Sequence, residues 1–184
     1  MRQEETVARR GEGLRRTRDC FLSPLDAACF TPGAMNYSAP DLTLHPPRSP
    51  RARLGGYAIL PRALDKCRAE LAGKNGEYHY ACPLDMNFFE FTGVDPAALK
   101  AQVALGKGDG EILEWLKENQ PKPRAAHEVA QWSAFREAVA PADNGSREYV
   151  CGLVAAAKAA HREDIATWFD LLDVDDFASF GGKP

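Results

Sequence analysis

The chain has 184 residues, of which 45% are hydrophobic and 27% are charged, and its formal net charge is −3. This length and composition are typical of one globular domain. The slight negative charge argues against a nucleic-acid-binding protein, which is usually basic, and no apolar run approaches the roughly 20 residues that a membrane-spanning helix needs. We therefore expect neither nucleic acid nor a membrane as a partner.

The cysteines follow no recognised bonding pattern. Their number is odd, their spacing is wide, and none forms a Cys-x-x-Cys pair: Cys20, Cys29, Cys67, Cys82 and Cys151. This pattern argues against a disulfide framework and against a zinc site. We therefore expect reduced thiols, a cytoplasmic location and no bound metal. The sequence indicates no particular cofactor.

The beginning of the chain differs from the rest. Residues 1–34 carry scattered arginine and glutamate side chains with little periodicity, and Met35 is a possible alternative translation start. We expect residues 1–40 to be a disordered N-terminal extension and residues 41–184 to form a single helical domain. Removal of residues 1–34 is expected to leave folding intact.

The first expected helix lies between residues 60 and 71. Its apolar residues recur at helical spacing, Pro61 fits the first turn, and Gly73 follows as a stop signal: Leu60, Leu64, Cys67 and Leu71. Asn75-Gly76 is typical of a turn. Cys82-Pro83 then predicts the start of a second helix, with Pro83 at its first helical position and three phenylalanines, Phe88, Phe89 and Phe91, on its buried face.

The remaining segments also predict helices. Asp95-Pro96 opens one of them, with Asp95 as the N-cap. Further apolar stripes follow at helical spacing, with Ser146 as the expected cap of the fourth group: Leu99 and Val103; Ile112, Trp115 and Leu116; Val129, Trp132, Phe135 and Val139; Val150, Leu153, Val154 and Ala157; Ile165, Trp168, Phe169 and Leu172. We predict a mainly α fold of about six or seven short helices. A short hairpin or extended segment near residues 56–60 and 77–80 remains open.

The stretch from residue 48 to residue 91 is the best candidate for a site. It combines forked guanidinium donors, glycines that permit close approach, and aromatic hydroxyls, which together suit an anion. Its candidate ligand-binding residues are Arg48, Arg53, Tyr57, Arg62, Tyr78, His79 and Tyr80. We expect a non-catalytic module that binds an anionic small molecule or an acidic protein segment.

The charge pattern leaves a second explanation open for these arginines. Seven basic residues stand against two acidic ones between His45 and Lys74, whereas six acids stand against two bases between His161 and Pro184. The two ends of the domain can therefore face each other through ordinary ion pairs. Exposed pairs contribute only about 0–1 kcal/mol each.

A small enzyme is the alternative function. Cys82 at a helix N-terminus meets unpaired N–H groups that stabilise a thiolate, and His79 lies three residues before it. Either residue, with Asp85, can perform nucleophilic or acid/base chemistry. Each also has an ordinary structural explanation, as a helix cap, a packed histidine or a helix-start acid.

Several motifs together resemble a known family: LGGY at 54–57, LPRALDKCRAELAG at 60–73, GEYHYACPLD at 76–85, GKGDGEILEWL at 106–116 and REDIATWFDLLDVDDFASFGG at 162–182. They are similar to the bacterial family catalogued as domain of unknown function 5069, from about Asp41 to Gly182. The resemblance implies a small, bacterial, cytoplasmic helical protein. It implies no activity and assigns no catalytic residue.

Overall fold

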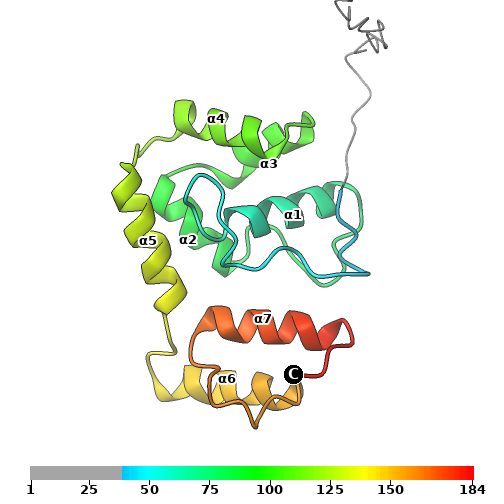
Figure 1. Cartoon of the computed structure of the whole chain (residues 1–184). Coiled ribbons are helices and arrows are strands. Elements are labelled where there is room, and N and C mark those ends of the chain that lie inside the picture. Colours follow the sequence, from blue (N-terminus) through cyan, green and yellow to red (C-terminus); the bar gives the residue numbers. More distant parts are fainter. Residues whose placement is uncertain (1–38) are drawn as a thin grey trace, which may run out of the picture. The chain divides into compact units, whose positions relative to one another are not determined.

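The computed structural model describes residues 39–184, which form seven α-helices (Figure 1). These are α1 (Leu60–Leu71), α2 (Pro83–Thr92), α3 (Pro96–Ala104), α4 (Asp109–Asn119), α5 (Ala126–Ala138), α6 (Asn144–Ala156) and α7 (Trp168–Ser179). The predicted mainly α fold is confirmed. The expected N-terminal extension, except for Ala39 and Pro40, lies outside the described residues.

Helix starts follow the expected chemistry at α2 and α3. Cys82 is the N-cap of α2 with Pro83 in the first turn, and the Asp95 carboxylate accepts a hydrogen bond from the Ala98 amide at 3.0 Å at the start of α3. The start of α6 differs from expectation. Asp143 is the N-cap, and Ser146 is the third helical residue, paired with it reciprocally.

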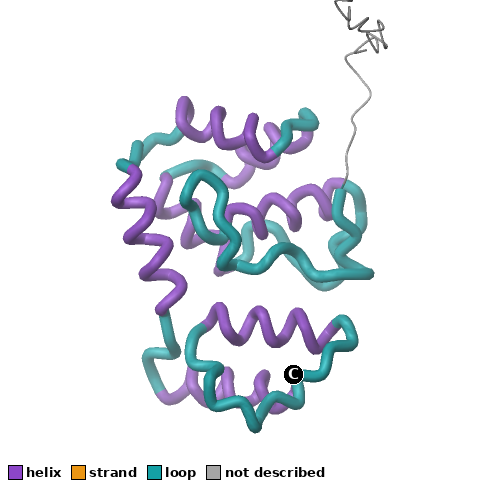
Figure 2. The backbone as a smooth tube through the Cα atoms, viewed as in Figure 1, coloured by secondary structure: helices purple, strands orange, loops and turns teal. Residues whose placement is uncertain are grey.

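The possible extended segments do not form strands in the described part of the chain (Figure 2). Leu54 and Tyr57 make an isolated antiparallel bridge around the Gly55-Gly56 turn. Residues 77–80 run from one turn through irregular backbone into the next turn, and the Tyr78 amide donates to the Asn75 carbonyl at 2.9 Å. Gly76 adopts φ 54°, and a Cβ there would stand 2.9 Å from the Leu42 carbonyl oxygen, so this turn requires glycine.

Two clusters of buried side chains form the core. The larger one joins α1 to α2, α3 and α4 through Leu64, Phe88 and Leu99, and it also includes Phe169 of α7. The smaller one lies between α6 and α7 and includes Leu171 and Val174. Helix α7 therefore packs on two sides, and its Phe169 side faces the α1 group.

Two residues of the predicted apolar stripes are exposed. These are Leu71, at the last turn of α1, and Phe135, on α5. Ile165 precedes α7, which begins at Trp168, but its side chain still packs against the smaller cluster. Periodicity identifies the buried face of a helix but not the edge at which burial stops.

No helix in residues 39–184 combines the length and the apolar character needed to cross a membrane.

Candidate functional site

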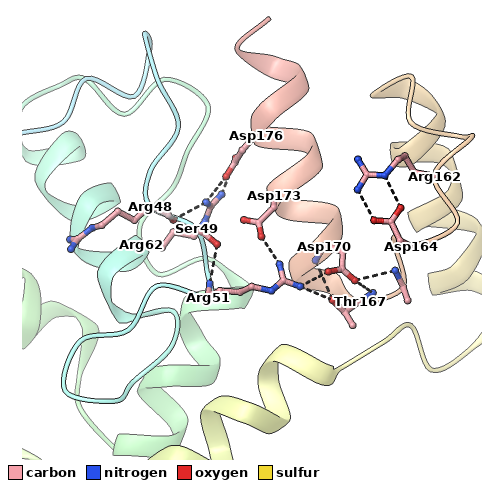
Figure 3. A network of polar contacts seen from close by, with 11 residues as sticks. Arg48, Ser49, Arg51, Arg62, Arg162, Asp164, Thr167, Asp170, Asp173 and Asp176 are labelled. Carbon is pink, nitrogen blue, oxygen red and sulfur yellow. Dashed lines mark hydrogen bonds and ion pairs between the residues drawn. The ribbon is translucent and has the colours of Figure 1, made fainter. Parts of the chain in front are cut away.

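A network of ion pairs connects the loop before α1, and α1 itself, to α7 (Figure 3). Arg51 pairs with both Asp170 and Asp173 of α7. Arg62 of α1 donates to both carboxylate oxygens of Asp176, at 2.6 and 3.1 Å. The second explanation for the arginines, pairing with the acidic end of the same chain, is therefore realised for these two.

Two more arginines of the candidate stretch are also paired within the chain. Arg48 donates to Asp65 at 2.8 Å and to Asp109 at 2.7 Å, which ties α1 to the start of α4. Arg53 donates to Glu137 of α5 at 2.7 Å. An external anion at either arginine would have to compete with a carboxylate already in place.

Two of the three candidate tyrosines hold the scaffold together. The buried Tyr57 hydroxyl donates to the Gln120 side chain at 3.1 Å, and its ring meets Phe88 edge to face. The Tyr80 hydroxyl donates to the Pro96 carbonyl at 2.9 Å. The third, Tyr78, donates to Asp176 at 2.7 Å beneath the guanidinium of Arg62.

A pocket of about 760 Å³ lies where α1, the turn before α2, α6 and α7 meet. Four residues of the predicted site line this pocket, namely Arg62, Tyr78, His79 and Cys82. The other predicted site residues lie outside it. Its apolar wall consists of Leu42, Leu84, Tyr149, Leu172 and Phe180. An apolar wall with a few convergent polar groups is typical of a small-molecule site.

Lys66, one turn of α1 beyond Arg62, is a second buried cation that lines the pocket. Its side chain is only 3% exposed, and its ammonium lies 2.8 Å from Asp85 and 3.1 Å from the Cys82 sulfur. Lysine is almost never buried unless it is paired. The predicted site residues did not include Lys66; its place four residues after Arg62, on the same helical face, was the available signal.

Asp85 lies behind the pocket and is fully buried. Burial raises the pKa of its carboxyl group, and the neighbouring Lys66 opposes that rise. Although Lys66 is close, neither oxygen of Asp85 accepts a hydrogen bond of ordinary geometry from the described residues. The Lys66 ammonium, 2.8 Å away, is therefore the main group that favours the charged form of Asp85.

Arg62 and Lys66 differ in how far their charges are neutralised. Burial disfavours the charged guanidinium, but Asp176 outweighs this effect and raises the pKa of Arg62. The Arg62 charge is thus fully matched by a carboxylate with two good hydrogen bonds. Lys66 is paired with Asp85 at 2.8 Å but lacks the two carboxylate hydrogen bonds that Arg62 makes, so its ammonium is the less fully satisfied cation of the two.

The outer part of the pocket carries the opposite charge. Glu77 and Asp175 are exposed and line it beside His79. No group of three or more histidine, cysteine or acidic residues in the described part of the chain is arranged to hold a metal ion. The pocket therefore presents a cation at its inner end and carboxylates at its outer end.

The fold and the pocket define a class of all-α domains in which ion pairs join an N-terminal helical group to a C-terminal helix. The model of the family described as "Domain of unknown function (DUF5069)" matches residues 44–178, and the chain belongs to this family. The comparison with curated proteins gives no match.

Proposed function

We propose that this chain is a non-catalytic binding module whose pocket takes a small molecule with an anionic group. The anionic group would meet Lys66 at the inner end. The observation that carries the proposal is a nearly buried ammonium that lines a pocket of about 760 Å³ and, among residues 39–184, is paired with the single carboxylate of Asp85.

The ligand we expect is dipolar rather than purely anionic. Glu77 and Asp175 line the pocket and are exposed, so a second anionic group on the ligand would meet like charge there. A cationic or hydrogen-bond-donating group would instead find complementary partners. An amino acid derivative or a short peptide has this combination of groups.

An acidic protein segment is the less favoured partner. It would have to engage the more accessible arginines, but the half-buried Arg48 and Arg51 and the exposed Arg53 are each paired with carboxylates of this chain. The alternative function, a small enzyme, is also less favoured. Acid/base chemistry would be helped by a hydrogen bond from His79 to Cys82 or to Asp85, and no such bond is present among the described residues. The wide cysteine spacing supports a cytoplasmic setting for the module.

A matched set of three probes tests the proposal: aminocaproate, caproate and hexylamine share one chain length and differ in their charged ends. A ligand that binds only the native state stabilises it by RT ln(1 + [L]/Kd), so the melting temperature rises with ligand concentration and with affinity. We expect the dipolar probe to stabilise the protein most and hexylamine least. The binding is then measured by titration calorimetry.

Variants locate the bound probe. Lys66→Met should abolish the stabilisation by aminocaproate, and the exposed changes Glu77→Gln and Asp175→Asn should reduce it without affecting folding. Arg53→Ala is the control, because Arg53 pairs with Glu137 and does not line the pocket. Equal binding by the Glu77→Gln, Asp175→Asn and wild-type proteins, or tightest binding by caproate, would contradict the dipolar arrangement.

A further inference from the structure

Cys82 and Lys66 form an unusual pair at the inner end of the pocket. The sulfur of Cys82 accepts a hydrogen bond from the Lys66 ammonium at 3.1 Å. Cys82 is also the N-cap of α2, so its sulfur lies near the positive end of that helix. A neighbouring ammonium and a helix N-terminus are the two surroundings in which protein thiols react most readily.

The backbone before Cys82 is strained. Ala81 adopts φ 56°, in the left-handed region that residues with a Cβ seldom occupy. Such strain costs about 1–3 kcal/mol and persists where the surrounding structure requires it. Here the strained residue directly precedes Cys82, whose sulfur lies 3.1 Å from the Lys66 ammonium.

The three cysteines of the described part differ in access and environment. Cys82 lines the pocket, so a small oxidant can reach its sulfur. Cys67 is fully buried, and burial raises the pKa of its thiol to about 12. Cys151 is exposed on α6 and lies outside the pocket residues. Only Cys82 therefore combines access with an adjacent buried amine.

We propose that Cys82 is a peroxide-reactive thiol whose oxidised form is trapped by the Lys66 amine as a sulfur–nitrogen cross-link. This site goes beyond ligand binding and does not depend on it. The oxidant is a small hydroperoxide, hydrogen peroxide being the simplest.

The first step is oxidation of the sulfur. The Cys82 sulfur attacks one peroxide oxygen, the S–O bond forms, and the O–O bond breaks. The departing oxygen leaves as water or an alcohol with the thiol proton, and Cys82 becomes a sulfenic acid. The sulfur loses two electrons and the peroxide gains them.

The second step is condensation with the amine. Lys66 passes one ammonium proton to Asp85, which lies 2.8 Å away and holds a proton readily because it is buried. The neutral nitrogen attacks the sulfur, the N–S bond forms, and the S–O bond breaks. The hydroxyl group leaves as water with a second proton from the nitrogen.

The cross-link joins α1 to the start of α2 and removes the Lys66 ammonium as a cation from the pocket. If the pocket binds an anionic group at Lys66, oxidation would therefore switch that binding off. A thiol reductant would restore both residues, because sulfenamides are cleaved by thiols.

Mass spectrometry of the full chain treated with hydrogen peroxide tests the proposal. The cross-linked product should lack two hydrogen atoms, and trypsin should fail to cut after Lys66. The peptide of residues 63–68 would then remain joined to the peptide of residues 75–100, and dithiothreitol would separate them. A disulfide between Cys67 and Cys82 would leave Lys66 open to trypsin and would overturn the proposal.

Variants complete the test. Cys82→Ser should abolish the cross-link, and the control Cys151→Ser should retain it. Lys66→Arg keeps the charge but cannot be trapped, so its Cys82 should accumulate as a sulfenic acid that dimedone labels. If Lys66→Arg does not fold, Cys67→Ala decides, because the cross-link must survive it. Loss of the cross-link in Cys67→Ala, or a product that gains oxygen at Cys82 without joining the peptides, would overturn the proposal.

Discussion

The guanidinium of Arg62 and the carboxylate of Asp176 share two hydrogen bonds although 114 positions separate them in the sequence. Both side chains are buried, and Tyr78 donates a third hydrogen bond to the same carboxylate. This pair fastens α7 to α1 along one side of the pocket. The arginines that the sequence offers as ligand-binding groups serve here to join the two ends of the domain.

Asp176→Ala should destabilise the protein strongly. Removal of one partner leaves the other charge buried without a counterion, which costs about 3–5 kcal/mol. Glu137→Ala is the matched control, because it frees Arg53 from a more exposed pair, which costs about 0–1 kcal/mol. Urea denaturation gives both free energies of unfolding. Equal losses in free energy of unfolding would show that the buried Arg62–Asp176 pair contributes no more to stability than the exposed pair does.

The pair of Lys66 and Asp85 should show coupled stability effects that depend on pH. Burial raises the pKa of Asp85 above its ordinary value of 3.8. The protonated group therefore stabilises the folded state below that pH, and this stabilisation is lost as pH rises through the folded-state pKa. Lys66→Met removes the charge that limits this rise. We expect Lys66→Met to cost about 3–5 kcal/mol near neutral pH and much less below about pH 4.

A double-mutant cycle separates the pair from its parts. Lys66→Met combined with Asp85→Leu removes both charges and fills the space with apolar groups, so the double variant should lose less stability than the sum of the single variants. Denaturant titrations at several pH values measure all four proteins. Additive losses would contradict direct coupling between the two side chains.

Local signals in the sequence predict much of the fold. Proline in the first turn and a capping residue before it mark the starts of α2 and α3, because both effects act within a few residues. The start of α6 was misassigned to Ser146, since Asp143 and Ser146 both suit a cap and only the backbone decides between them. Strand-like residue types at 77–80 were overridden by the turns on either side.

The site depends on contacts that no local pattern specifies. Arg62 and Arg53 belong to the same basic stretch, yet one lies against the pocket and the other pairs with α5. Charge composition predicts that arginines meet acids but does not assign the partners. Lys66 was overlooked because a lysine on an amphipathic helix is usually exposed.

Removal of residues 1–34 should leave the domain folded. The two buried clusters are built from residues 57–174, and the pocket residues begin at Leu42. A chain that starts at Met35 should therefore keep its melting temperature, with a change in the free energy of unfolding of about 0.5 kcal/mol or less. Calorimetry of the two chains compares them. A large fall in melting temperature would show that the first 34 residues support the core.

The contribution of Asp109 to stability should depend on pH in the opposite direction to that of Asp85. Burial raises the pKa of this carboxyl group, but hydrogen bonds from Arg48 and Arg68 outweigh burial, and the net pKa is lowered from 3.8. A carboxyl group whose pKa is lowered by folding stabilises the folded state above its unfolded-state pKa. This stabilisation is lost as pH falls through the folded-state pKa. Asp109→Asn should therefore cost about 1–3 kcal/mol at neutral pH, and the difference from wild type should shrink below about pH 4.

Asp95→Asn is the control for the Asp109 prediction. Asp95 caps α3, and asparagine caps a helix about as well as aspartate, so this variant should stay close to wild type at neutral pH. Thermal unfolding followed from pH 3 to pH 7 compares wild type, Asp109→Asn and Asp95→Asn.

The stability losses of Asp109→Asn and Lys66→Met should both shrink in acid, but for different reasons. For Asp109→Asn, the wild-type protein loses its ion-paired carboxylate. For Lys66→Met, the variant gains a proton on Asp85. High salt separates the two, since Asp109 is partly exposed and Asp85 is buried, and only the Asp109→Asn loss should then diminish at neutral pH.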